Sequence, residues 1–476
     1  MPINGFLYPG AKFIPPYEVA NSVRYNDDDS PSMYKTPGSS GNRRTWTFST
    51  WFKRGNLGSS QWILDAYGGS SDEFHIYISS GNAIGIYTIG GGFGNNLTIS
   101  TNNLVRDVSA WYHLVVRCDT TQSTASDRLR IYLNGVEATY GTYNNFTENG
   151  EGQVNEASTK HWLGRRNAGD HFDGYMAETV LVDGLSLAPT SFGEFDSASP
   201  TVWKPIDVSG LTFGTNGFYL DYEDSSNLGN DANGGTDFTE ANLDATNQST
   251  DTCTNNFATL NPLNAASGGT FTFSEGNLRV KGADTIEGYT SSTIGFSQGK
   301  WYFECESNFN TQGVIGITFD GDLGRVADDV RQDRYPGDAP YSYGYIFSNG
   351  NKVTNSSSSS YGNSLATGDI LGVAIDLDNM KLYFSKNGTF QNSGDPTSGS
   401  TGTGAIDLTG SGSTGFCFVT VGDNNNAGYG QIDFNFGSPF FSISSGNADA
   451  NGHGNFEYSV PSGYFALCSK NLAEFG

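Results

Sequence analysis

Residues 368–388 read Gly-Asp-Ile-Leu-Gly-Val-Ala-Ile-Asp-Leu-Asp-Asn-Met-Lys-Leu-Tyr-Phe-Ser-Lys-Asn-Gly, which is two apolar strands joined by a short polar turn. The pair Asn387-Gly388 closes the far end, and both residues tolerate the positive φ of a type I′ hairpin turn. The same pattern occurs in the first half of the chain, at residues 111–119 and 129–135. A chain that repeats strand, turn and strand in two separate halves is typical of two β-sandwiches, which usually bind rather than catalyse.

The composition favours an all-β protein. The chain has 476 residues, enough for two or three domains with full cores. It holds 63 glycines, 25 tyrosines and 32 phenylalanines, and stretches of helix-forming residues are nearly absent. We therefore predict two tandem antiparallel β-sandwiches, preceded by an extended N-terminal arm.

The formal net charge of −25 restricts the partners. An acidic surface repels phosphate backbones, so we predict no nucleic-acid binding. The same surface could attract divalent cations such as calcium, but a plain solvated acidic surface is the preferred explanation of the charge. The carboxylate-rich stretch 221–235 fits either a linker or a calcium-ordered loop, and its spacing differs from that of an EF-hand.

The cysteines and the N-terminus indicate the place of assembly. The five cysteines lie far apart without a Cys-x-x-Cys pair, so neither a disulfide framework nor a zinc site is expected. We expect assembly in a reducing compartment. The first residues lack the pattern of a secretory signal, and no run of about 18 apolar residues occurs, so we expect no membrane insertion.

The chain divides into five predicted segments: an N-terminal arm (1–22), a first sandwich (23–190), a connector (191–265), a second sandwich (266–440) and a C-terminal extension (441–476). The arm combines prolines with large apolar residues. Such a segment is a poor strand and a poor helix, and it is too apolar for a comfortable disordered tail. We predict that it attaches the chain to a partner through Phe6, Leu7, Tyr8, Phe13 and Ile14.

The first sandwich resembles a known family. The segments 47–53, 111–116, 131–135, 163–164 and 172–178 are similar, in this order, to successive strands of a laminin-G/concanavalin-type lectin domain. The resemblance covers about 165 residues. It implies a lectin-like β-sandwich but says less about the ligand.

The second sandwich resembles a SPRY domain. The segments that carry this resemblance are 277–280, 299–304, 314–318, 341–345, 368–376, 382–388 and 432–437. The resemblance implies a bent β-sandwich whose loops recognise proteins or peptides. The loop 328–340 lies where SPRY domains carry recognition loops, and from it we predict the binding residues Arg331, Arg334, Tyr335, Asp338 and Tyr341.

Evidence for an enzyme is weak in this sequence. Glu304 and Glu306 share a strand face, about 7 Å apart, as paired carboxylates of glycoside hydrolases can. The glucanase pattern Glu-x-Asp-x-x-Glu is not met, because Phe309 stands in place of its last acid. The five histidines have no metal-site spacing, and there is neither a Gly-x-Ser-x-Gly elbow nor a Walker loop. We therefore predict a chain that is not an enzyme.

Glycan binding is better supported. Aromatic rings stack under the C–H faces of sugars, and amide or acidic side chains donate and accept hydrogen bonds at their rims. One end of the first sandwich offers such residues, although packing in the core would explain most of the aromatic ones. The predicted set is Trp62, Tyr67, Tyr87, Phe93, Asn95, Asn96, His161 and Arg165.

A laminin-G-like domain joined to a SPRY-like domain is similar to structural proteins of tailed bacteriophages. The resemblance implies a virion appendage, assembled in the host cytoplasm, such as a tail fibre or receptor-binding protein. It further implies other virion proteins and a host cell-surface glycan or protein as partners, and a homotrimer that gains avidity by repetition. Two alternatives stay open: a capsid-decorating or head-fibre protein, and a polysaccharide-degrading tail enzyme.

Overall fold

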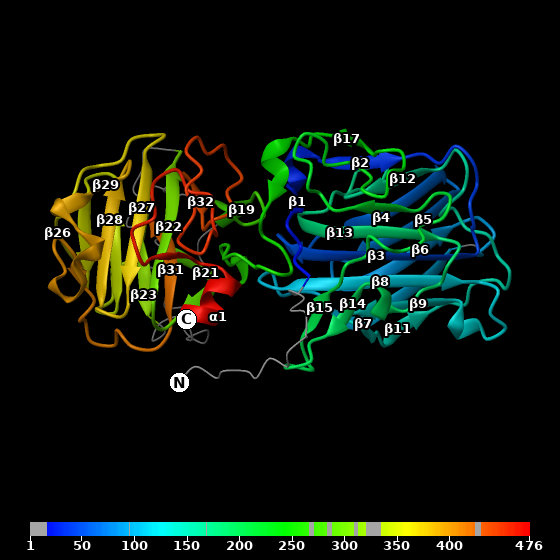
Figure 1. Cartoon of the computed structure of the whole chain (residues 1–476), viewed down its shortest axis with the longest axis horizontal. Coiled ribbons are helices and arrows are strands. Elements are labelled where there is room, and N and C mark those ends of the chain that lie inside the picture. The colour runs from blue at the N-terminus through cyan, green and yellow to red at the C-terminus, as the bar shows by residue number, and fades with distance from the viewer. Residues whose placement is uncertain are drawn as a thin grey trace, which may run out of the picture.

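The computed structural model describes residues 17–94, 96–167, 169–265, 271–282, 288–308, 313–319, 335–423 and 430–476. Two antiparallel β-sandwiches lie side by side along the longest axis of the molecule, the first on the right and the second on the left of Figure 1. The predicted fold class is confirmed. The five apolar residues of the predicted arm lie outside the described residues.

The first sandwich has two eight-stranded sheets. The sheet named here the β3 sheet contains, in order, β10 (Val136–Glu137), β9 (Leu129–Leu133), β8 (Trp111–Asp119), β3 (Thr45–Arg54), β13 (Gly174–Asp183), β1 (Ser22–Tyr25) and β18 (Gln248–Ser249), with β16 (Phe218–Leu220) also paired to β13. The opposite sheet, the β5 sheet, contains β11 (Tyr140–Tyr143), β7 (Leu97–Leu104), β6 (Ala83–Ile89), β5 (Asp72–Ile78), β4 (Gln61–Gly69), β12 (Lys160–Leu163), β2 (Ser32–Lys35) and β17 (Thr239–Ala241).

Much of the predicted connector belongs to the first sandwich. Its strands β16, β17 and β18 extend both sheets, and its residues Phe218, Leu220 and Phe238 join the first core. A separate ribbon of β14 (Gly193–Phe195) and β15 (Trp203–Pro205) also lies in this segment. Apolar side chains too sparse to form their own core can still be buried by edge strands of a neighbouring domain.

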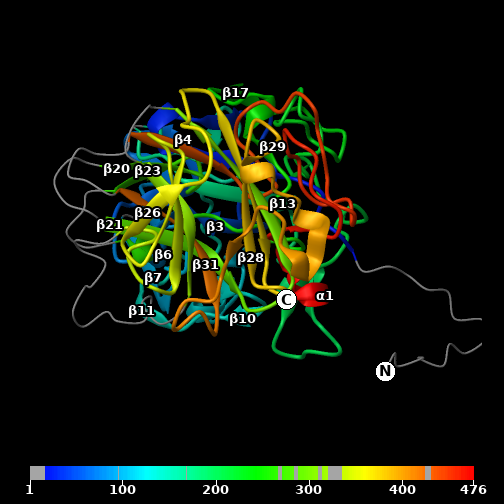
Figure 2. The ribbon, with the colours of Figure 1, turned by 90° about the vertical axis from the view of Figure 1, so that its left-hand side faces the viewer.

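The second sandwich has a nine-stranded and a six-stranded sheet. The larger contains β19 (Phe271–Ser274), β20 (Arg279–Gly282), β32 (Gln431–Asn435), β22 (Lys300–Ser307), β27 (Ile370–Asp376), β28 (Lys381–Lys386) and β29 (Thr389–Phe390), with β30 (Ile406–Asp407) and β33 (Phe465–Ala466) at its side. The smaller contains β21 (Gly288–Phe296), β31 (Cys417–Asp423), β23 (Gly313–Phe319), β24 (Ser342–Ile346), β25 (Asn351–Thr354) and β26 (Ser357–Ser360). Figure 2 views this sandwich from its outer end.

The hairpin predicted at residues 368–388 is present. β27 pairs with β28 from Leu371–Lys386 to Asp376–Lys381, and β28 continues into β29. Asn387 and Gly388 have φ of 47° and 76°, as a type I′ turn requires. Between the strands, 3₁₀ helices occupy Asp27–Asp29, Ala125–Asp127, Pro189–Ser191, Ala245–Asn247, Pro262–Asn264, Gln391–Ser393 and Pro396–Thr401.

The C-terminal extension packs on its own second sandwich. β33 pairs in parallel with β22, and the helix α1 (Ser469–Phe475) follows it. Phe456 and Tyr464 are buried there with Tyr302 and Tyr383 of the larger sheet. No helix in the described part of the chain is long and apolar enough to cross a membrane.

Buried polar contacts join the two sandwiches at a seam. Lys53 Nζ of β3 lies 2.8 Å from Asp251 Oδ2 and donates to Asn256 Oδ1 at 2.8 Å. Asn277 Nδ2, next to β20, donates to the Gly55 carbonyl at 2.8 Å. Because Lys53, Asp251 and Asn277 are buried, these contacts favour one arrangement of the two sandwiches.

Candidate functional site

The outer face of the β5 sheet carries a row of aromatic and charged side chains. Strand pairing places Tyr87 of β6, His75 of β5, Asp65 of β4, Trp162 of β12 and Tyr34 of β2 directly opposite one another in sequence across five strands. Successive side chains of a strand point to opposite faces. The alternate positions therefore face inward, and they supply the first core.

A β-bulge brings Trp62 to this face. Trp62 pairs with Tyr77, but the next pair is Leu64 with Ile76, so Ile63 is an extra residue in β4. Leu64 and Ile63 are fully buried. Without the extra residue, Trp62 would share the inward face of Leu64, because residues two apart lie on one side of a strand.

Trp62, Tyr77 and Tyr87 form a surface that we call the aromatic platform. The rings of Trp62 and Tyr77 are stacked, with centroids 5.3 Å apart and planes 19° apart. Gly85 lies directly beneath the Tyr77 ring, and a Cβ at this position would be only 2.5 Å from that ring. All three aromatic side chains are half-buried, so each is fixed by neighbours and still presents some surface to solvent.

Buried charges lie beside the platform. The Nδ1 of His75 is 3.0 Å from Asp65 Oδ1, and its Nε2 is 2.8 Å from Glu73 Oε2, although neither contact is aligned as a hydrogen bond. Arg166 Nη2 lies 3.4 Å from the same Glu73 oxygen. The His75 ring is parallel to the Tyr87 ring, at 6.0 Å. The His75 imidazole thus lies between the carboxylates of Asp65 and Glu73, and the Arg166 guanidinium lies beside Glu73, next to the platform.

The same three residues are the metal candidate of the described part of the chain. One ligand atom from each of Asp65, Glu73 and His75 lies within 4.8 Å of the others. The two carboxylates approach opposite edges of the imidazole, however, and Arg166 brings a positive charge to Glu73. These contacts fit a chain of pairwise polar contacts better than a set of ligands converging on one cation. Calcium stays an untested prediction.

The structure gathers several predicted glycan residues on one face. Trp62 and Tyr87 belong to the platform, and Tyr67 follows Asp65 by two positions on β4. Tyr87 donates its hydroxyl hydrogen to Asn96 Oδ1 at 3.2 Å. The guanidinium of Arg165 lies 4.8 Å from the centre of the Trp162 ring.

Two predicted residues point elsewhere. Phe93 is fully buried in the first core against Phe74, because its turn folds back over the sandwich. His161 faces inward, where its Nε2 accepts from the Asn155 backbone N–H at 3.0 Å and burial lowers its pKa to about 4. Neither side chain is available to a ligand on the outer face. Asn95 lies outside the described residues.

The sequence prediction missed His75 and Tyr77, although the pattern of their strand indicates that both face outward. Phe74-His-Ile-Tyr-Ile78 alternates, with Phe74, Ile76 and Ile78 fully buried. This alternation alone places His75 and Tyr77 outward together. Asp65 and Trp162 had no comparable signal, because their facing depends on pairing between strands that are distant in sequence.

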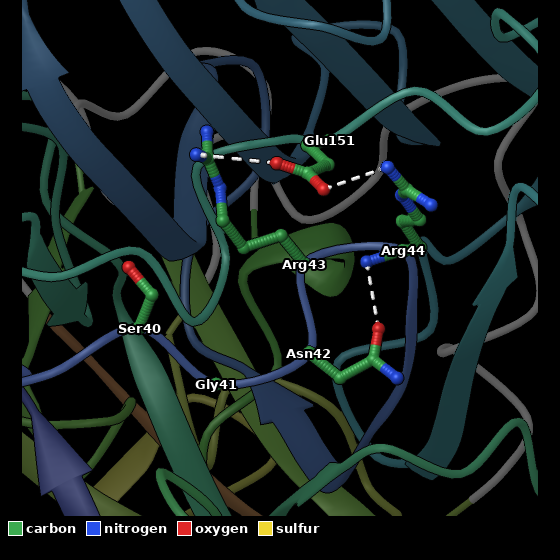
Figure 3. Close-up of a pocket in the computed structure, with 6 residues that line it drawn as sticks. All are labelled: Ser40, Gly41, Asn42, Arg43, Arg44 and Glu151. Carbon is green, nitrogen blue, oxygen red and sulfur yellow. Dashed lines mark hydrogen bonds and ion pairs between the residues drawn. The ribbon is translucent and has the colours of Figure 1, made fainter.

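A depression lies at the rim of the first sandwich, and Arg43, Arg44 and Glu151 are among the residues that line it (Figure 3). Its volume is about 620 Å³. Both guanidinium groups contact Glu151, at 3.8 and 2.9 Å, and Arg43 also lies 3.0 Å from Glu156. The positive charges of this depression are therefore already paired with acids.

The predicted SPRY loop is described only in part. Tyr335 packs beside Val314 and Val353, and the Asp338 carboxylate accepts a hydrogen bond from Ser356. Tyr341 packs against the second core. Arg331 and Arg334 lie outside the described residues, so binding by this loop stays a prediction.

The suspected acid pair has a structural role at Glu304. Its carboxylate is fully buried and accepts hydrogen bonds from the Tyr302 hydroxyl, at 2.9 Å, and from the backbone N–H groups of Glu457 and Tyr458, at 2.9 and 2.8 Å. Burial raises the pKa of Glu304. The C-terminal extension thus covers the acid that a glycosidase would have to expose.

Comparisons with known proteins agree with the two sandwiches. Residues 28–186 match the concanavalin A-like lectin/glucanases superfamily, and residues 300–403 match the SPRY domain. A Ran-binding proteins 9/10 homolog of Drosophila melanogaster is 33% identical over 124 residues, which cover 24% of this chain and only 12% of that protein.

Solved structures resemble parts of the chain at low sequence identity. The SPRY domain of human HERC1 is 13% identical with a TM-score of 0.28, and the match covers 37% of this chain and 96% of that one. A proposed carbohydrate-binding protein from Bacteroides ovatus is 13% identical with a TM-score of 0.34, covering 47% and 59% of the two chains. The two family-model matches, at residues 28–186 and 300–403, show that the chain contains a concanavalin A-like domain followed by a SPRY domain.

Proposed function

We propose that this chain is a non-catalytic adhesion protein that holds a glycan on the aromatic platform. The observation that carries the proposal is the bulge at Ile63, which turns Trp62 out of the core and stacks it on Tyr77. A partly exposed pair of aromatic rings on a rigid sheet offers a surface on which the C–H face of a sugar can stack. The rings lose little freedom on binding, because their neighbours already fix them.

We further propose that the adhesion serves a bacteriophage virion, as part of a tail fibre or receptor-binding protein. The joining of a lectin-like domain to a SPRY domain supports this placement. In this proposal the chain is assembled in the host cytoplasm and forms a homotrimer. It contacts other virion proteins through its N-terminal arm and a host surface glycan or protein through its sandwiches. Three copies of a weak platform would raise the avidity for a repeated surface glycan.

Binding of the purified chain to host cells and to a polysaccharide array tests the adhesion. Trp62→Ala removes half of the stacked pair, and an aromatic contact is worth about 1 kcal/mol, so Kd should rise roughly fivefold or more. Phe416→Ala is the matched control, because Phe416 is an aromatic residue of the other sandwich with 51% exposure. Equal binding by the two variants would contradict a role for the platform.

Localisation in purified particles tests the virion placement. We expect the chain in the particle proteome and antibody label at the tail tip in electron micrographs. Label over the head would instead favour capsid decoration, and absence from particles would refute the virion proposal. Release of new reducing ends from host exopolysaccharide would refute the non-catalytic assignment.

A further inference from the structure

We propose that the glycan held on the β5 sheet is acidic, and that Lys160 and Arg165 bind the carboxylate of a uronic acid unit. This inference rests on the proposed glycan-binding function and names the class of sugar. The two cations lie at the end of the row formed by Trp162 and Tyr34, and Tyr87 of the aromatic platform forms the other end. A neutral part of the glycan would stack on the platform while the carboxylate lies at the cations.

The two cations both lie against the indole ring of Trp162. Lys160 Nζ lies 4.3 Å from the ring centre of Tyr34 and 5.0 Å from that of Trp162. Arg165 Cζ lies 4.8 Å from the centre of the same indole ring. Trp162 is only 9% exposed, so its ring serves to hold the cations rather than to stack a sugar. Cation–π contacts keep both side chains in place before a ligand arrives.

Arg165 is ordered further by its own loop. Its Nε donates to the Arg166 carbonyl at 2.9 Å, and its Nη2 donates to the Asn167 carbonyl at 2.9 Å. These bonds neutralise no charge, because both acceptors are backbone oxygens. The remaining N–H groups of a fixed, planar guanidinium suit a carboxylate, which accepts through two oxygens.

Neither cation has an acidic partner within the described chain. No described carboxylate lies within 4.0 Å of Lys160 or Arg165, whereas the adjacent Arg166 is paired with Glu73 and Asp170. The whole chain has 50 acidic residues and 25 Lys and Arg residues. What distinguishes these two cations is that both lie against one indole ring, where an external anion could contact them together.

The dimensions of the row suit an oligosaccharide. Lys160 is the cross-strand partner of Tyr67 on β4, the strand that also carries Trp62 of the platform. Three strand steps separate Trp162 from Tyr87, which at about 4.8 Å per step gives a span of roughly 14 Å. A segment of several sugar units can therefore reach from the cations to the platform.

The net charge of −25 narrows the class of acid. A dense polyanion would bring many charges close to the acidic surface, where repulsion acts over a screening length of about 8 Å at physiological salt. A polysaccharide with widely spaced uronic acids brings one charge to the cation pair and keeps the next ones distant. We therefore expect uronic acids separated by neutral sugars rather than a heparin-like chain.

The test compares acidic polysaccharides with their carboxyl-reduced forms. The acidic polymers are glucuronoxylan and bacterial heteropolysaccharides that contain isolated uronic acids. Each is immobilised beside the same polymer after carbodiimide-borohydride reduction of its carboxyl groups. The full chain should bind an acidic form with a Kd roughly tenfold or more below that of its reduced form, as a charge-assisted contact predicts. Lys160→Gln and Arg165→Gln should remove most of that preference.

Arg106→Gln is the matched control. Arg106 is exposed on the same sandwich, so this variant changes the net charge equally at a distance from the row. Its preference for the acidic form should be unchanged, and thermal unfolding of all variants checks their folding. Equal binding to acidic and reduced forms by the unaltered chain would overturn this inference while leaving glycan binding intact. Failure to bind any polysaccharide would overturn both proposals.

Discussion

Replacing Lys53 with methionine should strongly destabilise the seam between the two sandwiches. The Lys53 ammonium is buried and approaches three oxygens: Asp251 Oδ2 at 2.8 Å, Asn256 Oδ1 at 2.8 Å and the Phe257 carbonyl at 3.2 Å. Asp251 and Phe257 are on the segment that leads to the second sandwich. Methionine fills a similar volume but donates nothing to these acceptors.

The expected cost follows from the charge that is left behind. The Asp251 side chain is only 2% exposed, and without Lys53 its carboxylate keeps one side-chain donor, the Trp111 indole N–H at 3.1 Å. Breaking a buried ion pair from one side costs about 3–5 kcal/mol, because the remaining charge stays desolvated. Asp251→Asn in the same chain removes that charge. The double variant should therefore be more stable than the sum of the single effects predicts, by about 2 kcal/mol.

Urea unfolding followed by tryptophan fluorescence measures these differences. The two sandwiches need not unfold in one step, so the transitions of both are recorded before a free energy of unfolding is assigned. Lys204→Met is the control, since Lys204 forms ion pairs with Glu194 and Asp196 near the solvent, and its midpoint should not change. The reasoning is refuted if Lys53→Met costs less than about 1 kcal/mol, or if the two replacements act additively.

Two further predictions concern a titrating acid and the platform. Glu178 accepts hydrogen bonds from Tyr17 and Tyr219, and burial raises its pKa to about 7. A raised pKa stabilises the fold below the unfolded value of 4.5, and this stability is lost as pH rises toward 7. The free energies of unfolding measured with urea at pH 5 and pH 8 should therefore differ by about 2.5 kcal/mol from this group, a difference that Glu178→Gln abolishes. Gly85→Ala should displace the Tyr77 ring and weaken glycan binding on the array, whereas unchanged affinity would show that the stacked pair is not needed.

The sequence predicted those features whose cause is local. The β27–β28 hairpin follows from two apolar runs on either side of a short polar turn. The next turn, from β28 to β29, follows from Asn387-Gly388, because these two adjacent residues adopt the positive φ that a type I′ turn needs. In each case the physical determinant lies within a few residues of the feature.

Features with distant causes were predicted poorly. The segment 191–265 was assigned as a connector because its residues 221–235 are rich in turn formers and carboxylates. Phe218 and Phe238 are nevertheless buried in the first core, against strands more than thirty residues away. His161 was expected to face a ligand, and only the pairing of β12 between β2 and β4 shows that it faces inward while Trp162 faces outward. Register between strands that are far apart in sequence decided these outcomes.

The candidate site illustrates why a binding face is harder to predict than a fold. From the alternation of β4 alone, Trp62 and Leu64 share a face, and Leu64 belongs to the core. The extra residue Ile63 reverses this assignment for Trp62. The core tolerates the bulge, since Ile63 and Leu64 are both buried beside it, so the fold gives no sign that the register has changed. A single inserted residue thus leaves the sandwich intact while it creates the aromatic pair on which the proposed function depends.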